Sequence, residues 1–271
     1  MPFPMTRIED QEISRLMIGT NWFLGYSHYS SAKDRWIKQH MTLDRIVEVM
    51  GVFCHEGVNA IMSSPDPRIR EAIDRVKAET GVDCKWACTP SAEGLDDLLP
   101  EIERCAELGA TFCMPHQHWT DGNMIVNQQR ILGLGKVTER IRELGMIPGL
   151  STHRPETVVL CDKAGYDVAT YIQIYNPLGF LCQVETDWIE KIINETEKPI
   201  MCIKPLAAGR VLPSVGFGYV YHSIKTIDTV CVGTLNAQEA AEDIAIVRRL
   251  LGESAKQQEL TYSRSKAALV R

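Results

Sequence analysis

Eight short apolar runs, each followed by a stretch with helical periodicity, are the feature that most restricts how this chain of 271 residues can fold. The runs contain β-branched, aromatic or Cys residues, as strands do. They span 15–22, 58–64, 82–90, 111–116, 146–153, 169–177, 200–206 and 229–234. Between them lie helical patterns such as 43–57, 68–81 and 136–145. Eight strands alternating with eight helices in about 250 residues is the size and rhythm of a (β/α)8 barrel.

The doubly wound open sheet has the same alternation, but it normally carries a G-x-G-x-x-G sequence after its first strand. No such sequence is present. We therefore predict an α/β fold, a single-domain (β/α)8 TIM barrel at 15–252. A polar lead-in at 1–14 would precede it, and a C-terminal tail or surface helix at 253–271 would follow. Chemistry in such barrels lies at the C-terminal ends of the strands, so functional residues are expected there.

Composition restricts the class of function. The formal net charge of −6 gives no support to a nucleic-acid partner, which normally needs a basic patch. No apolar run reaches the length of about eighteen residues that a membrane span requires. The start of the chain lacks the pattern of a secretory signal, and the nine cysteines include no C-x-x-C pair. We expect a cytoplasmic protein with reduced thiols and a small-molecule substrate, and leave open whether it forms a homo-oligomer.

Four segments resemble parts of one enzyme family. They are PGLSTHRPETVVLCDKAGYDVATYIQIYNPLG (148–179), IKPLAAGR (203–210), DTVCVGTLNAQEAAEDI (228–244) and, less closely, GVNAIMSS (57–64). All four are similar to segments of the aldo-keto reductase superfamily. Residues 148–179 resemble its fifth strand, the helix that follows and its sixth strand; 203–210 resemble its seventh strand, 228–244 its eighth strand and closing helix, and 57–64 its second strand. The resemblance spans about two-thirds of the chain. It implies a barrel and, in the family, reduction of carbonyl compounds with NADPH.

The family carries out that reaction with an Asp-Tyr-Lys-His tetrad, most of which is missing here. Met62 stands where the family has Asp, Pro67 stands where it has the proton-donating Tyr, and no lysine ends the third predicted strand. TFCMPH (111–116) is similar to the family segment that ends in the catalytic histidine, which implies that His116 is its counterpart. Ser151 matches a cofactor-binding position. The chain thus resembles a divergent member of the family with a different reaction.

His116 and His118 lie in the stretch MPHQHW, at the end of the fourth predicted strand. Residues i and i+2 of a strand share a face, so extended structure through His118 would direct both imidazoles into the barrel mouth. His153 ends the next strand, roughly 5 Å away. Three imidazoles suit a divalent zinc, manganese or iron ion. Alternatively, His118 turns to solvent with Trp119 packed behind it, and His116 is a metal-free acid–base group or has a structural role.

Lys204 and Arg210 follow the seventh predicted strand. A desolvated lysine there can act as a base, a Schiff-base amine or a substrate anchor, whereas a lysine at the rim would pair with a carboxylate. Arg210 can hold a carboxylate or phosphate, or lie at the surface.

The segment 21–36 is predicted to be a long loop whose aromatic residues suit stacking on a ligand or burial in a dimer interface. Tyr175 and Asn176 can hydrogen-bond a substrate or a nicotinamide, or be a core aromatic and a turn asparagine. The predicted substrate-binding residues are Asn21, Trp22, Tyr26, Ser151, Tyr175, Asn176 and Arg210.

Three hypotheses about function follow. The first is a lyase, isomerase or hydrolase acting on a small sugar-like or oxo-acid substrate, in which the three histidines hold a divalent metal and Lys204 moves a proton. The second is an NAD(P)-dependent oxidoreductase in which His116 is the acid and the cofactor lies across Ser151, Tyr175 and Lys204. The third is a ligand-binding barrel without catalysis. The sequence favours the first.

Overall fold

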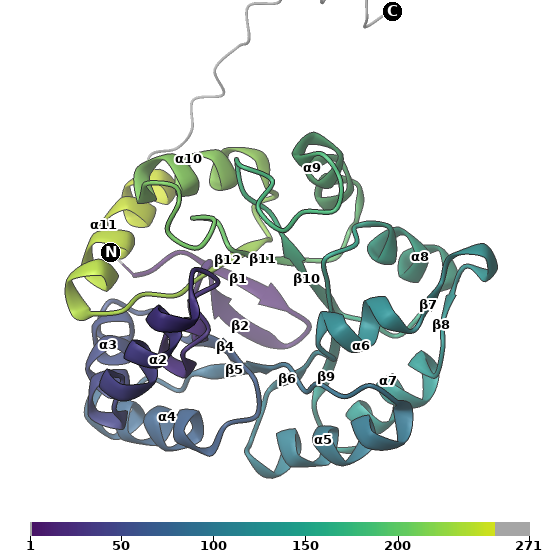
Figure 1. Ribbon diagram of the computed structural model, residues 1–271, viewed down its shortest axis with the longest axis horizontal. Coiled ribbons are helices and arrows are strands. Elements are labelled where there is room, and N and C mark those ends of the chain that lie inside the picture. Colours follow the sequence, from purple (N-terminus) through teal and green to yellow (C-terminus); the bar gives the residue numbers. More distant parts are fainter. Residues whose placement is uncertain (1, 253–271) are drawn as a thin grey trace, which may run out of the picture.

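Eight parallel strands close into a barrel in the computed structural model, which describes residues 2–252 (Figure 1). The barrel closes because the first strand pairs with the last as well as with the second. In barrel order the strands are β3 (Leu16–Gly19), β4 (Ala60–Ser63), β5 (Lys85–Cys88), β6 (Phe112–Cys113), β9 (Ile147–Thr152), β10 (Thr170–Ile174), β11 (Ile200–Ile203) and β12 (Thr229–Val232). The prediction of a single-domain (β/α)8 barrel is confirmed. Residues 253–271, predicted as a tail or surface helix, lie outside the described residues.

Helices form a ring around these strands (Figure 1). They are α3 (Leu43–His55), α4 (Pro67–Thr80), α5 (Leu95–Glu107), α7 (Leu134–Glu143), α8 (Glu156–Ala164), α9 (Thr186–Glu195), α10 (Pro213–Ser223) and α11 (Ala237–Gly252). Their apolar residues recur at helical spacing, as in α5, where Leu98, Ile102 and Cys105 are buried. Local residues set the helix starts: the Asp66 side chain accepts a hydrogen bond from the Arg68 amide (2.9 Å) just before α4.

Residues 5–14 lie within the segment predicted as an N-terminal lead-in at 1–14. They form an antiparallel hairpin of β1 (Met5–Ile8) and β2 (Gln11–Ser14), which crosses the middle of the barrel in Figure 1. Ile8 and Ile13 are fully buried in the same apolar cluster as the inward-facing Met17 and Phe112. The hairpin therefore closes the N-terminal end of the barrel, and a ligand must enter from the C-terminal end.

Short helices and strands lie in the loops at that open end. The segment predicted as a long loop after β3 contains two helices, α1 (Asn21–Leu24) and α2 (Ser31–His40). After β6 come α6 (Gln117–Gly122), the ribbon of β7 (Met124–Ile125) and β8 (Arg130–Ile131), and the 3-10 turn η1 (Val126–Gln128). Within residues 2–252, no helix has the length and apolar character needed to cross a membrane.

Candidate active site

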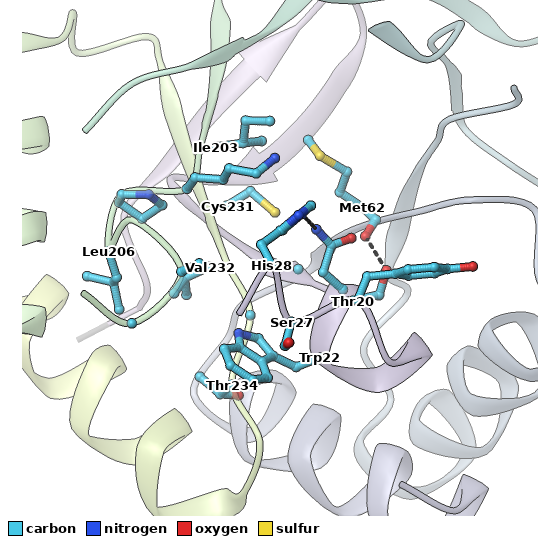
Figure 2. A pocket seen from close by; sticks show the side chains of 18 of the residues that line it. Thr20, Trp22, Ser27, His28, Met62, Ile203, Leu206, Cys231, Val232 and Thr234 are labelled. Atoms are coloured by element: carbon cyan, nitrogen blue, oxygen red, sulfur yellow. Dashed lines mark hydrogen bonds between the residues drawn. The ribbon is translucent and has the colours of Figure 1, made fainter. Parts of the chain in front are cut away.

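The C-terminal end of the barrel opens into a cavity of about 780 Å3. Its floor is apolar and includes Met62, Ile203 and Cys231, which lie at the inner end in Figure 2. Trp22 and Thr234 lie together at the other end of the same view, with His28 between the two groups. The cavity thus extends from the barrel mouth outward over the loops that follow β11 and β12.

Lys204 lines this cavity directly after β11. Among residues 2–252, no carboxylate forms an ion pair with it. Burial lowers the pKa of its ammonium from 10.5 to about 8. Its backbone is left-handed (φ 59°), a conformation that non-glycine residues rarely adopt and that costs about 1–3 kcal/mol. An unpaired lysine in a strained conformation at the cavity wall is typical of a functional residue.

Three histidines of the cavity wall, His28, His116 and His153, have pKa values below their usual range. Burial is the largest cause in each case, and the positive charge of Lys204 is the next. The pKa of His153 falls to about 4. These imidazoles are therefore neutral at pH 7, where they can donate or accept hydrogen bonds beside a protonated Lys204.

His118 does not join this group, and the predicted metal-ligand set is wrong. The chain leaves the extended conformation after His116, which caps α6: its Nδ1 accepts a hydrogen bond from the His118 amide (3.3 Å). In the helix His118 is exposed and does not line the cavity, while the next residue, Trp119, is fully buried. Among the described residues, no group of three or more His, Cys, Asp or Glu is placed to hold a metal ion. The alternation of a strand does not apply beyond His116.

The fold has close counterparts among solved structures. A putative aldo-keto reductase from Pseudomona aeruginosa matches with a TM-score of 0.66 and 15% identity, over 92% of this chain and 94% of that one. A glycerol dehydrogenase from Gluconobacter oxydans matches with a TM-score of 0.57 and 13% identity, over 93% and 97%. An aldose reductase from Giardia lamblia matches with a TM-score of 0.55 and 11% identity, over 93% and 94%. These matches show that the chain shares the barrel fold of those proteins. No protein-family model and no curated protein matches its sequence.

The positions that the resemblance assigns to the reductase tetrad are occupied as the sequence indicates. Met62 lines the floor of the cavity, and Pro67 is the first residue of α4 and does not line the cavity. Lys85 begins β5 and pairs with Asp83 (2.9 Å), so it lies at the opposite end of the strand from the cavity. His116, the counterpart of the family histidine by that resemblance, lines the cavity, and Lys204 lies directly after a different strand, β11.

Four of the predicted substrate-binding residues line the cavity: Asn21, Trp22, Tyr26 and Ser151. The Asn21 amide nitrogen lies 3.2 Å from His28 Nε2, so it orients that imidazole. Lys33 covers the Trp22 ring at 4.4 Å.

Tyr175 and Asn176 do not line the cavity, which contradicts their predicted contact with a ligand. Tyr175 is buried between the barrel and the helices, with its hydroxyl 2.8 Å from Glu190 of α9 and 3.0 Å from Ser223 of α10. Asn176 closes a turn, because its side chain accepts from the Phe180 amide (2.8 Å) and donates to the Phe180 carbonyl (3.1 Å). Both fit the structural alternative.

Arg210 also lies outside the cavity wall. Its guanidinium donates to the carbonyls of Ala207 and His28 (3.1 Å each) and covers the Phe180 ring at 4.2 Å. It therefore ties the loop after β11 to the segment that carries His28. This makes Arg210 a positioning residue, where the sequence predicted a ligand contact.

An acidic group that was not predicted from the sequence lies at the outer end of the cavity. Glu239, Glu242 and Asp243, all on α11, line it near Thr234. Asp243 is 3% exposed, and burial together with the two nearby glutamates raises its pKa to about 7. Helical periodicity could have predicted that Asp243 is buried, because it shares the buried face of α11 with Ala240 and Val247.

Proposed function

We propose that the cavity is the active site of an oxidoreductase that reduces a small oxo-acid or sugar-like carbonyl compound with a nicotinamide dinucleotide. The observation that carries this proposal is Lys204, a desolvated ammonium without a carboxylate partner among the described residues, next to neutral histidines. Solved proteins with this fold, described as an aldo-keto reductase and a glycerol dehydrogenase, add support. The metal-assisted hypothesis loses its support because His118 lies outside the cavity.

The outer half of the cavity fits a dinucleotide. A Cβ on Gly233 would lie 2.7 Å from Cδ1 of Trp22, so the missing side chain lets Trp22 pack against the backbone at this part of the wall. The Thr234 hydroxyl is buried at the wall with no hydrogen-bond partner within residues 2–252. Loops after the seventh and eighth strands of such barrels commonly bind phosphate. Thr234, Lys33 and the backbone around Gly233 would hold the cofactor, which supplies a hydride when bound.

Lys204 is the proton donor in this proposal. Reduction of a carbonyl places negative charge on its oxygen, and the Lys204 ammonium would donate a proton there. An acid whose pKa lies near the working pH performs this transfer best, and such catalysis contributes about 10²–10⁴ in rate. Neutral His116 would donate a hydrogen bond to the same oxygen, which stabilises the developing charge. Trp22 and Tyr26 also line the cavity and would exclude water from the bound substrate.

The test is a steady-state assay with NADH and with NADPH against a panel of aldehydes, 2-oxo acids and sugars, followed by nicotinamide absorbance. We expect turnover with at least one compound, and K204M should lower kcat/KM by about 10²–10⁴. The matched control is K136M, which removes an exposed lysine of α7 and should leave kcat/KM unchanged. Absence of turnover together with absence of cofactor binding would overturn the proposal. Cofactor binding without turnover would favour the non-catalytic ligand-binding barrel.

A further inference from the structure

The two ends of the cavity carry opposite charge. Lys204 and the neutral histidines surround the inner end, at the barrel mouth. Glu239, Glu242 and Asp243 line the outer end, on the first turns of α11. If the proposed function holds, the reacting nicotinamide occupies the inner end, because the proton donor is there. The other end of the dinucleotide, its adenosine ribose, then reaches the acidic residues.

The acidic end is built as a binding site. Thr234 is 2% exposed, and its hydroxyl has no hydrogen-bond partner among the described residues. The Asp243 carboxylate, 3% exposed, likewise makes no hydrogen bond or ion pair within residues 2–252. Buried polar groups without partners are costly, and a bound ligand that supplies them removes the cost. Both residues line the same cavity, so one ligand can contact both.

The neighbouring charges are mostly negative. Glu239 accepts a hydrogen bond from the Leu235 amide (2.8 Å), which holds its carboxylate at the start of α11. Lys33 also lines the cavity, but its ammonium lies over the rings of Trp22 (4.4 Å) and Tyr29 (5.2 Å). Among residues 2–252, no arginine lines the cavity, so the described wall lacks the group that usually pairs with a ribose 2′-phosphate.

We propose that this acidic end selects the unphosphorylated dinucleotide, NAD(H), over NADP(H). The inference rests on the proposed function. A ribose diol donates hydrogen bonds to carboxylates, which Glu239, Glu242 and Asp243 supply at this end of the cavity. A 2′-phosphate carries about −1.5 to −2 charge at pH 7 and accepts hydrogen bonds without donating them when ionised. Next to Glu239 and Glu242, and to Asp243 where it is ionised, the phosphate would be repelled at short range, in a site partly shielded from solvent.

The test is calorimetric titration of the full chain with NADH and with NADPH at one ionic strength. We expect NADH to bind about tenfold or more tightly than NADPH, a difference of about 1.4 kcal/mol. The double variant E239Q/E242Q removes two charges from exposed positions and keeps the hydrogen-bond acceptors. It should strengthen NADPH binding about tenfold and change NADH binding much less. D243N tests the buried carboxylate in the same way, and E139Q on the exposed face of α7 is the matched control that should change neither constant.

The outcomes separate the two proposals. NADPH binding as tightly as NADH, or E239Q/E242Q leaving the ratio of the two constants unchanged, would overturn the selection of NAD(H) and leave the proposed function intact. Failure of the wild-type chain to bind either nucleotide would overturn the proposed function itself.

Discussion

Removing the Lys204 ammonium should stabilise the protein while it destroys the activity. The side chain is half-buried at the wall of the cavity, and no described carboxylate offsets the cost of desolvating its charge. Proteins commonly retain such unfavourable groups where function needs them. Lys204→Met keeps a similar length and removes the charge, so it isolates the electrostatic cost.

The size and sign of the effect follow from the pKa of Lys204. The difference between 10.5 in the unfolded chain and about 8 in the folded protein corresponds to about 3 kcal/mol. Because the side chain faces a cavity open to solvent, we expect K204M to raise the free energy of unfolding at pH 7 by about 1–3 kcal/mol. Between about pH 8 and 10.5 the unfolded chain binds more protons at Lys204 than the folded one, so wild-type stability should rise with pH there.

Urea denaturation of wild type and K204M at pH 7 and near pH 10 measures both effects. The two proteins should differ at pH 7 and converge at the higher pH, because wild-type Lys204 is then neutral. K136M, at an exposed position of α7, should change the free energy of unfolding by less than about 0.5 kcal/mol. A K204M variant that is less stable than wild type at pH 7, or a difference that does not change with pH, would refute the account of Lys204 as a buried, unpaired cation.

Three further predictions concern other parts of the site. H118A should leave kcat/KM within about twofold of wild type, whereas H116N, which keeps the helix cap, should lower it about 100-fold; equal effects in steady-state kinetics would contradict the placement of His118 outside the cavity. R210M should lower the free energy of unfolding by about 1–2 kcal/mol through loss of its hydrogen bonds to Ala207 and His28 and should raise KM; an unchanged KM would remove Arg210 from the positioning of His28. G233A should lower the free energy of unfolding by about 1–3 kcal/mol, because its Cβ would lie 2.7 Å from Trp22. The control is G218A on α10, whose Cβ would meet no described atom within 4 Å and which should be neutral or stabilising when both variants are compared by thermal denaturation.

The strands and much of the inner cavity were predictable from local pattern. Each apolar run became a barrel strand, and the rule that function lies at strand C-termini placed Ser151, His153 and Lys204 in the cavity. Tyr175 was misjudged although the same rule of alternation applies to it. Ile172 faces the cavity, so Tyr171 and Tyr175, one and three residues away, face the helices.

Other features required tertiary information. His118 leaves the cavity because α6 starts one residue after His116, a boundary that a two-residue spacing does not reveal. The hairpin at 5–14 has strands of only four residues, whose role becomes visible through the burial of Ile8 and Ile13 under the barrel. Arg210 carries a guanidinium, a group that commonly binds anions. Its structural role follows from its hydrogen bond to the carbonyl of His28, a residue far away in sequence.

The central claim, that the cavity is a nicotinamide site, is tested most directly by titrating NADH into the full chain while tryptophan fluorescence is followed. Trp22 is one of five tryptophans and lines the outer half of the cavity, where the dinucleotide would lie. We expect saturable binding of one NADH per chain with quenching that is largely lost in W22F, while calorimetry still detects binding to W22F. No saturable binding by either method at millimolar NADH or NADPH would contradict the claim.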